Sequence, residues 1–242
     1  MNLKNSFPNK SDKELKQIAR KFYTHLTDTI FESIKGYTVP LEKLTKRYEL
    51  TNPEILNKFH EQGKDAITAG GHYGNWEWGP QVLPSVIKHD SKMLYKPLSN
   101  KLIDNHLKKN RAKYKGELVN IKFTRRIFSE EKHTPIAVVM IGDQSPANKK
   151  KAIWVNFLNQ DTACIHGIEF YAKLFKIPVL YFEIKKIKRG YYKIYLETLS
   201  ENPQDLPKEE LTKLYMKRLE KTIIEKPEYY LWSHKRWKHK RT

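Results

Sequence analysis

The chain has 242 residues, of which 39% are hydrophobic and 12% aromatic, so it has enough apolar material for a core and too much for a disordered protein. It carries 46 Lys and Arg against 27 Asp and Glu, and the net charge of +19 favours anionic partners: nucleic acid, an anionic membrane, a phosphorylated substrate or an acidic carrier protein. No apolar run approaches the ~20 residues that cross a bilayer, and the first residues lack the apolar segment of a signal peptide, so we expect a soluble or peripheral protein.

Helical patterns come first along the chain. Ser11 and Glu14 have the spacing of a capping box, and apolar residues follow at three- and four-residue intervals until Gly36, which predicts an amphipathic helix of about two dozen residues. We expect this helix to pack along the domain, with a groove or a membrane surface as the alternatives. Pro53 stands at the first position of a second, shorter helix that Gly63 ends.

Strands and helices alternate after that. A strand predicted at 65–69 leads into the glycine-rich turn 70–79, and the most apolar strand, 135–141, leads into the polar turn 142–146. The other predicted strands are 92–98, 117–122, 152–158, 178–185 and 191–198. Two further helices are predicted to end near Ile87 and Tyr114, and three more to cover 124–131, 167–176 and 207–225. With no repeat and no long linker, the sequence predicts one α/β domain over residues 1–242, with a central mixed, largely parallel sheet flanked by helices.

The turn 70–79 carries His72 and Glu77, a base and a carboxylate five positions apart. On one helix such positions lie about 140° apart and would not meet. The pair therefore requires His72 in the turn and Glu77 at the start of the next helix, with the glycines supplying the backbone freedom. Glu77 would then hold one imidazole nitrogen while the other takes a proton from a hydroxyl. The alternative is a surface histidine followed by a helix-capping glutamate.

Asp143 and Gln144 follow the 135–141 strand. Because sites in α/β sheets gather outside the carboxyl ends of strands, we expect both residues near His72. We expect no metal, because the histidines of the tail and the one beside Cys164 have no second cluster to complete a zinc site. Cys164 is the only cysteine, which rules out an internal disulfide, and it is expected to be a small buried hydrophobe.

The C-terminal tail, 229–241, interleaves aromatic and basic residues, among them Trp232, Arg236 and Trp237. Such a pattern suits a membrane interface, where rings lie at headgroup depth and cations meet anionic lipid. It also suits single-stranded nucleic acid, through base stacking and backbone charge. A solvated tail is the third interpretation.

Five stretches match, in order, the motifs of a known family. His72 and Glu77 have the spacing of a His-x4-Asp/Glu motif, and the other four stretches are 95–100 with Arg111, 141–146, 154–158 with the helix from Gly167, and 227–238. Together they resemble the bacterial lipid A biosynthesis (lauroyl/myristoyl) acyltransferase family, within the glycerolipid acyltransferase superfamily. The resemblance runs from about residue 2 to the end. Lys96 replaces the family's usual arginine, and the chain begins where an apolar anchor usually ends, so we expect that anchor to be absent.

The resemblance implies transfer of a fatty acyl chain from acyl carrier protein or CoA to a hydroxyl of a lipid A precursor, at the cytoplasmic face of the inner membrane and without a further cofactor. His72 would be the general base and Glu77 would orient it. The implied substrate-binding residues are Lys96, Arg111, Arg125, Arg126, Asp143 and Gln144, with the arginines on phosphates.

The expected partners follow from the same resemblance: acyl carrier protein, a phosphorylated lipid acceptor and an anionic membrane surface, but no nucleic acid. All three expected partners are anionic and therefore fit the charge of +19. Two alternative functions are a basic nucleic-acid-binding module and a protein with the acyltransferase fold that has lost its activity.

Overall fold

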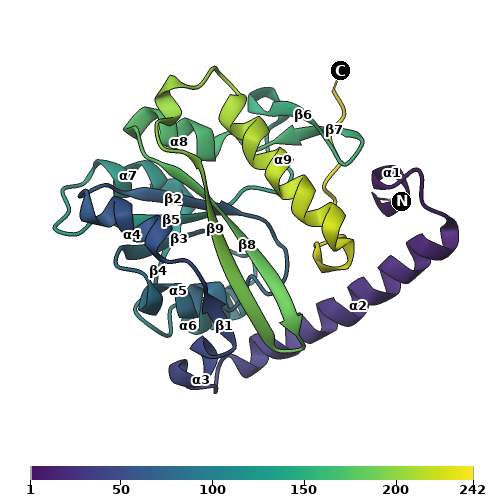
Figure 1. Ribbon diagram of the computed structural model, residues 1–242, viewed down its shortest axis with the longest axis horizontal. Helices are drawn as coiled ribbons and strands as arrows, with labels where there is room; N and C mark the ends of the chain where they lie inside the picture. The colour runs from purple at the N-terminus through teal and green to yellow at the C-terminus, as the bar shows by residue number, and fades with distance from the viewer. Residues whose placement is uncertain (1, 242) are drawn as a thin grey trace.

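The computed structural model describes residues 2–241, and a seven-stranded sheet lies at their centre (Figure 1). In spatial order its strands are β1 (Tyr48–Leu50), β9 (Tyr191–Ser200), β8 (Val179–Lys188), β2 (Ala66–Gly70), β5 (Ile136–Ile141), β3 (Asp90–Tyr95) and β4 (Glu117–Asn120). Neighbouring strands are parallel except β8 and β9, which form an antiparallel hairpin. β6 (Ile153–Phe157) and β7 (Gln160–Cys164) form a separate antiparallel pair. The predicted α/β fold with a mixed, largely parallel sheet is confirmed.

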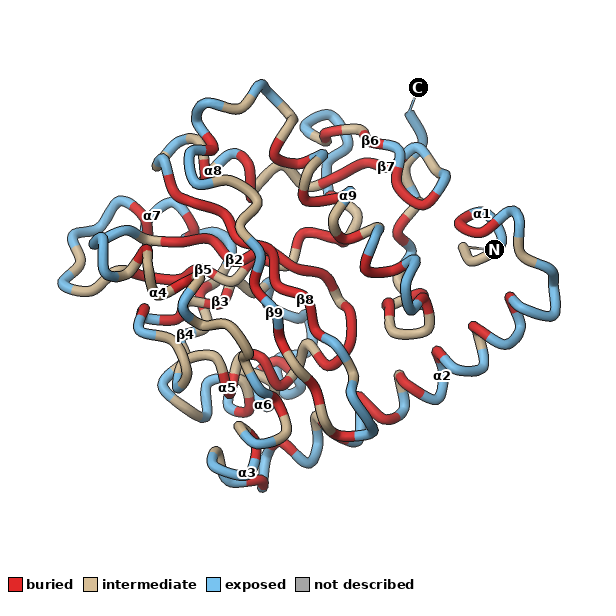
Figure 2. Tube along the Cα trace, in the orientation of Figure 1, coloured by how far each residue is buried: buried red, intermediate tan, exposed pale blue. Residues whose placement is uncertain are grey.

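Helices cover both faces of the sheet because its central strands are apolar on both sides. In β2, Ile67 and Ala69 belong to the core that contains α8 (Gly167–Phe175) and α9 (Glu210–Glu225). Ala66, on the other face, belongs to the core that contains α4 (Glu54–Glu61) and α5 (Gly79–Val86). This division follows the two-residue period of a strand. Figure 2 shows the buried central strands in red.

The long helix α2 (Asp12–Lys35) runs along the outside of the domain, as predicted (Figure 1). The Ser11 side chain accepts the backbone N–H of Glu14 and the Glu14 carboxylate accepts the backbone N–H of Ser11, so the predicted capping box is confirmed. α2 reaches the β8–β9 hairpin, where Lys186 pairs with Asp28 at 3.1 Å. No helix within the described residues has both the length and the apolar character needed to cross a membrane.

Element boundaries differ from the predicted ones where a polar side chain caps the next turn. β3 ends at Tyr95, and β4 ends at Asn120, whose side chain accepts the backbone N–H of Lys122 and starts the 3-10 helix η1 (Ile121–Phe123). Asn100 caps α6 (Lys101–Arg111). The other short elements are α1 (Asn2–Ser6), α3 (Leu41–Thr45), α7 (Thr124–Ser129), η2 (Lys149–Lys151), η3 (Pro203–Asp205) and η4 (Pro227–Tyr229). Neither α1, α3, β1 nor β7 was expected from the sequence pattern.

The C-terminal tail folds into the core, and this corrects its assignment to a membrane interface. Trp232 and Arg236 are only 7% and 2% exposed, and the half-buried Trp237 stacks on Trp232 with ring centroids 6.4 Å apart. Inside the protein, Arg236 donates through Nη1 to the backbone carbonyl of Ala163 in β7 at 2.6 Å, and its Nη2 lies 3.3 Å from the sulfur of Cys164. Trp232 and Arg236, enclosed in this way, cannot lie among lipid headgroups or stack on bases.

Candidate active site

His72 is held by Asp143, which follows the neighbouring strand. β2 and β5 are parallel and place Gly70 opposite Ile141, so the turns after these two residues meet. Asp143 Oδ1 lies 2.6 Å from His72 Nδ1, and Asp143 Oδ2 accepts the backbone N–H of His72 at 3.0 Å. The Asp143 side chain is 2% exposed and the His72 side chain 19%. One buried carboxylate therefore fixes both the ring and the backbone of His72.

This hydrogen bond also selects the tautomer of His72. A carboxylate accepts, so the proton of the neutral ring lies on Nδ1 and Nε2 keeps a lone pair. Gln144 lies next to that lone pair, with its amide nitrogen 3.4 Å from His72 Nε2. The ring of Trp76 meets the imidazole edge-to-face at 5.5 Å and restricts its rotation. The sequence prediction that Asp143 and Gln144 lie beside His72 is therefore confirmed.

The pKa values of the pair shift in opposite directions. Burial acts to lower the pKa of His72, but the charge and the hydrogen bond of Asp143 outweigh it, and the pKa is raised above its ordinary value. Burial acts to raise the pKa of Asp143, but the charge and hydrogen bonds of His72 outweigh it, and this pKa is lowered. The arrangement supports an imidazole that readily accepts a proton beside a carboxylate that stays ionised.

Glu77 does not hold His72, which corrects the predicted His–Glu dyad. Instead Arg111, at the end of α6, donates through Nε and Nη2 to the two carboxylate oxygens of Glu77, at 2.9 and 2.7 Å. Trp76 Nε1 donates to the same carboxylate at 3.1 Å. The planar guanidinium offers Glu77 two parallel hydrogen bonds, whereas Asp143 already occupies the nitrogen of His72 that could donate. Glu77 thus orients the arginine and contributes only its charge to His72.

Asn75 shapes the turn between the two pairs. Its side-chain oxygen accepts the backbone N–H groups of Glu77 and Trp78, both at 3.1 Å, and so starts the turn that leads into α5. Its amide donates at 2.6 Å to the buried Glu32 of α2. Neither Asn75 nor Glu32 was predicted from the sequence. The Asn between His72 and Glu77 was the available signal for Asn75, whereas nothing local marks Glu32, 43 residues earlier.

The C-terminal segment supports the same turn from the other side. Leu231 donates its backbone N–H to the carbonyl of His72 at 3.1 Å, and Gly74 donates to the carbonyl of Tyr229 at 3.0 Å. Gly74 has a φ of +63°, and a Cβ there would lie 2.7 Å from the Ile184 side chain, so glycine is required. The tail that was expected to meet a membrane is instead a structural wall of the site.

Comparisons with known proteins identify the family of the chain. The family model of bacterial lipid A biosynthesis acyltransferases matches residues 1–239. The chain belongs to this family. A lipid A biosynthesis palmitoleoyltransferase of Escherichia coli K12 and a lipid A biosynthesis acyltransferase of Shigella flexneri are each 22% identical to it over 239 residues, which cover 98% of this chain and 76% of each relative. The predicted family and the prediction of an acyltransferase are confirmed.

The remaining predicted substrate-binding residues of this acyltransferase lie on the same edge of the sheet as His72. Lys96 follows β3 and is exposed, and Arg125 and Arg126 lie in α7, just beyond the end of β4. β3 and β4 are the second and third strands from β2. Arg126 pairs with Glu130 and its side chain is 69% exposed. These three cations therefore lie along the edge of the sheet that holds the site.

The histidines of the tail bind the loop after β5. His234 accepts the backbone N–H of Ser145 at 3.2 Å, and His239 donates to the carbonyl of Pro146 at 2.8 Å. Cys164 is buried, as predicted, and lies 3.3 Å from Nη2 of Arg236. Among the described residues, no three His, Cys, Asp or Glu side chains are grouped so that they could hold a metal ion.

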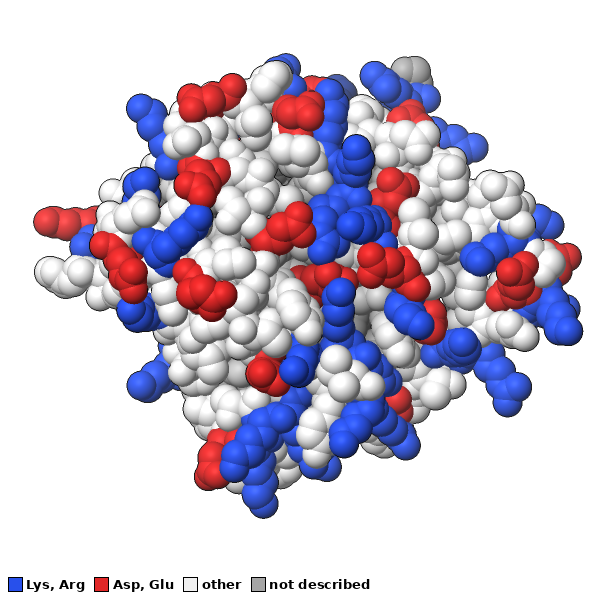
Figure 3. All heavy atoms as spheres, viewed as in Figure 1, with Lys and Arg blue, Asp and Glu red and all other residues white. Residues whose placement is uncertain are grey.

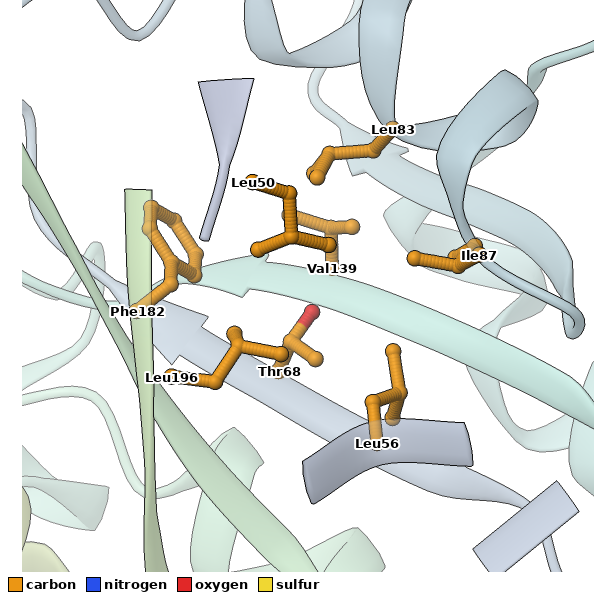
Figure 4. A pocket seen from close by; sticks show the side chains of 8 residues that line it. All are labelled: Leu50, Leu56, Thr68, Leu83, Ile87, Val139, Phe182 and Leu196. Carbon is orange, nitrogen blue, oxygen red and sulfur yellow. The ribbon is translucent and has the colours of Figure 1, made fainter. Parts of the chain in front are cut away.

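A closed apolar cavity lies on the α4 and α5 face of the sheet (Figure 4). Its volume is about 10 Å³, the room that one water molecule needs. Thr68 in β2 is the one polar side chain in its lining, and its buried hydroxyl has no hydrogen-bond partner among the described residues. The cavity is too small for a fatty acyl chain and belongs to the core.

Proposed function

We propose that this acyltransferase moves a fatty acyl chain from the thioester of acyl carrier protein or CoA to a hydroxyl group of a lipid A precursor. The observation that carries the proposal is the His72 imidazole, held at Nδ1 by Asp143 so that Nε2 is unprotonated, with the Gln144 amide nitrogen 3.4 Å from its lone pair. A base in this state takes the proton of the hydroxyl as its oxygen attacks the thioester carbonyl. When the tetrahedral intermediate collapses, the C–S bond breaks and the imidazolium returns the proton to the leaving thiolate.

Asp143 supports both halves of this reaction. Its negative charge stabilises the imidazolium that forms during the attack, and its hydrogen bond keeps Nε2 aimed at the hydroxyl. In this proposal Asp143, and not Glu77, orients the base. The fold brings the two residues together through the register of β2 and β5.

Arg111 binds a phosphate group of the acceptor lipid in this proposal. Glu77 engages Nε and Nη2 of its guanidinium, so Nη1 is not used by that pair. The side chain is 25% exposed and therefore accessible to a ligand. Lys96, Arg125 and Arg126, further along the same edge, supply the field that attracts a phosphorylated lipid and an acidic carrier protein. We place the protein peripherally at the cytoplasmic face of the inner membrane, with no further cofactor.

The test is an assay of the purified protein with acyl-acyl carrier protein or acyl-CoA and a lipid A precursor, with products identified by mass spectrometry. We expect a product heavier by one acyl group with at least one donor. His72→Ala should lower the rate by about 10²- to 10⁴-fold, because it removes the general base. Circular dichroism and thermal unfolding show whether the variant folds like the wild type. Undiminished turnover by His72→Ala would refute the mechanism. If the wild type forms no product, the alternative of a protein with this fold that has lost its activity would hold.

A nucleic-acid-binding module was the alternative, and the structure weakens its basis. Trp232 and Arg236, the residues that would stack on bases and meet phosphates, are buried. The high positive charge remains, but charge alone does not require a histidine held by a buried aspartate at a strand end.

A further inference from the structure

The solvent-facing side of α2 is apolar over the second half of the helix. Tyr23, Ile30, Phe31 and Ile34 are 63%, 52%, 63% and 58% exposed. With about 100° per residue, the four side chains fall within an arc of about 100°. Single exposed hydrophobic residues are common, but four on one face of one helix form a patch.

The acids of this stretch point the other way. Between Lys21 and Lys35 the only charged residues are Asp28 and Glu32, and both are buried. Asp28 pairs with Lys186 and with Arg189 of the hairpin, at 3.1 and 2.8 Å. Glu32 accepts hydrogen bonds from Asn75 and from Tyr192 of β9. A helix that packs on a protein core normally turns its apolar side inward and its charges to water. This half of α2 turns both acids inward and its large exposed apolar side chains outward, with Leu26 still packed on the core, so its outer side suits an apolar environment.

Cations lie at both ends of the apolar patch. Lys13, Lys16 and Arg20 line a shallow hollow on the first half of α2, and the helical period places Lys16 and Arg20 in line with the exposed hydrophobic residues. At the other end, Figure 3 shows Lys and Arg gathered where the β8–β9 hairpin meets α2. An apolar stretch flanked by cations is the pattern of a helix that lies flat in a membrane interface.

The end of α2 is joined to the segment that follows Arg111. Tyr37 follows α2 and is 38% exposed. Lys113 donates to the carbonyl of Tyr37 at 2.9 Å and so joins the end of α2 to the segment after α6.

We propose that the outer face of α2, comprising Lys13, Lys16, Arg20, Tyr23, Ile30, Phe31 and Ile34, lies on an anionic lipid bilayer. The apolar residues enter the headgroup layer while the cations meet lipid phosphates. A second copy of the chain is the competing occupant, but two chains of charge +19 would repel each other, whereas an anionic bilayer attracts the cations. The choice of lipid as occupant rests on the proposed function, in which the acceptor is a membrane lipid.

The test is cosedimentation with vesicles of phosphatidylethanolamine containing about one third phosphatidylglycerol, a fraction that gives an anionic surface. Phe31→Ser with Ile34→Ser should weaken binding by about tenfold or more, because two apolar side chains no longer enter the bilayer. The matched control is Phe170→Ser with Leu174→Ser, an aromatic and an aliphatic residue of α8 that are 49% and 46% exposed. This control should bind like the wild type. Equal weakening by both variants, or no weakening by the α2 variant, would overturn the proposal.

A second pair of variants separates charge from insertion. Lys16→Glu with Arg20→Glu should weaken binding to the anionic vesicles and remove most of its salt dependence, with little effect on vesicles of phosphatidylcholine alone. A loss that is the same on both vesicle types would contradict a charge contact with lipid phosphates. Light scattering on the same samples tests the competing occupant, since a wild-type dimer that the Phe31 and Ile34 substitutions dissociate would overturn lipid docking.

No acyl donor is present in this experiment, so its result does not depend on catalysis. His72→Ala should bind the vesicles like the wild type even though it lacks the base. Vesicle binding without acyl transfer would refute the proposed function alone, and acyl transfer without vesicle binding would refute the docking surface alone.

Discussion

The two carboxylates of the site, Asp143 and Glu77, differ in burial and in partner. Asp143 is 2% exposed and faces an imidazole, a group that gains and loses a proton near neutral pH. Glu77 is 15% exposed and faces a guanidinium, which stays charged at any pH the protein meets. The first pair is therefore built to change its protonation during a reaction, and the second to keep its geometry. In the proposed function, proton transfer and phosphate binding therefore belong to separate ion pairs, of which His72 and Glu77 lie in the same turn.

The two pairs also depend on different parts of the fold. Asp143 reaches His72 because β2 and β5 are neighbours in register. Glu77 reaches Arg111 because Asn75 sets the turn into α5 and α6 ends beside it. A change in one pair can therefore leave the other intact, and this separation makes the two roles testable one at a time.

The largest expected effect is the difference in kcat between the variants Asp143→Asn and Glu77→Gln. The asparagine would keep the size of the side chain but lose the charge that stabilises the imidazolium, so kcat should fall by about 10²- to 10⁴-fold. Glu77→Gln keeps one acceptor for Arg111 and should mainly raise the KM for the acceptor lipid, by about tenfold. Steady-state kinetics on both variants, with thermal unfolding as the control for folding, measures the contrast. A larger loss of kcat in Glu77→Gln would reverse the assignment of roles.

A smaller effect is expected from Arg111→Lys. Lysine retains the positive charge but cannot form the two-bond contact with Glu77, so its position at the site is less fixed. The KM for the phosphorylated acceptor should rise by about tenfold with little change in kcat, since each lost charge-assisted hydrogen bond costs about 1.5–3 kcal/mol before lysine replaces part of it. The control is an acceptor without the phosphate, for which wild type and variant should have the same KM. A rise for both acceptors would show that Arg111 does not bind that group.

The sheet and the edge that holds the site were predictable from the sequence. Apolar runs such as 135–141 identify buried strands, and polar residues directly after them mark the carboxyl edge. The strand ends predicted that Asp143 lies near His72, but not that Asp143 rather than Glu77 holds the ring, because Glu77 is close in sequence whereas Asp143 is 71 residues away. Strand order and register decide which carboxylate reaches the ring, and a single sequence contains no local signal for either.

The tail and α2 also show that a sequence pattern does not determine which side chains are buried. The tail has the composition of a membrane interface, yet Arg236 is buried in the core and donates there to the backbone carbonyl of Ala163. α2 has the period of an ordinary amphipathic helix, yet Asp28 and Glu32 face inward because the hairpin and the turn supply partners for them. Periodicity predicts that a helix has two faces, but only the tertiary partners determine which face is buried.

The smallest expected effect concerns the pH dependence of the reaction, and it compares the two carboxylates directly. The base must be neutral, so kcat/KM should fall as the pH drops through the pKa of His72, which lies above its ordinary value near 6.5. Asp143→Asn removes the main charge that favours the imidazolium, so the pKa of His72 falls and the acidic limb of the profile moves to lower pH.

Glu77→Gln should move this limb in the same direction but less far. The charge of Glu77 favours the imidazolium less than that of Asp143 does, and the neighbouring Arg111 opposes it. We would measure kcat/KM against pH for the wild type and both variants and scale each profile to its own plateau. The pH at which each acidic limb reaches half of its plateau then gives their order. If the limb moves further in Glu77→Gln than in Asp143→Asn, then Glu77 controls the protonation of His72, and the hydrogen bond between Asp143 and Nδ1 would not be the contact that sets the base.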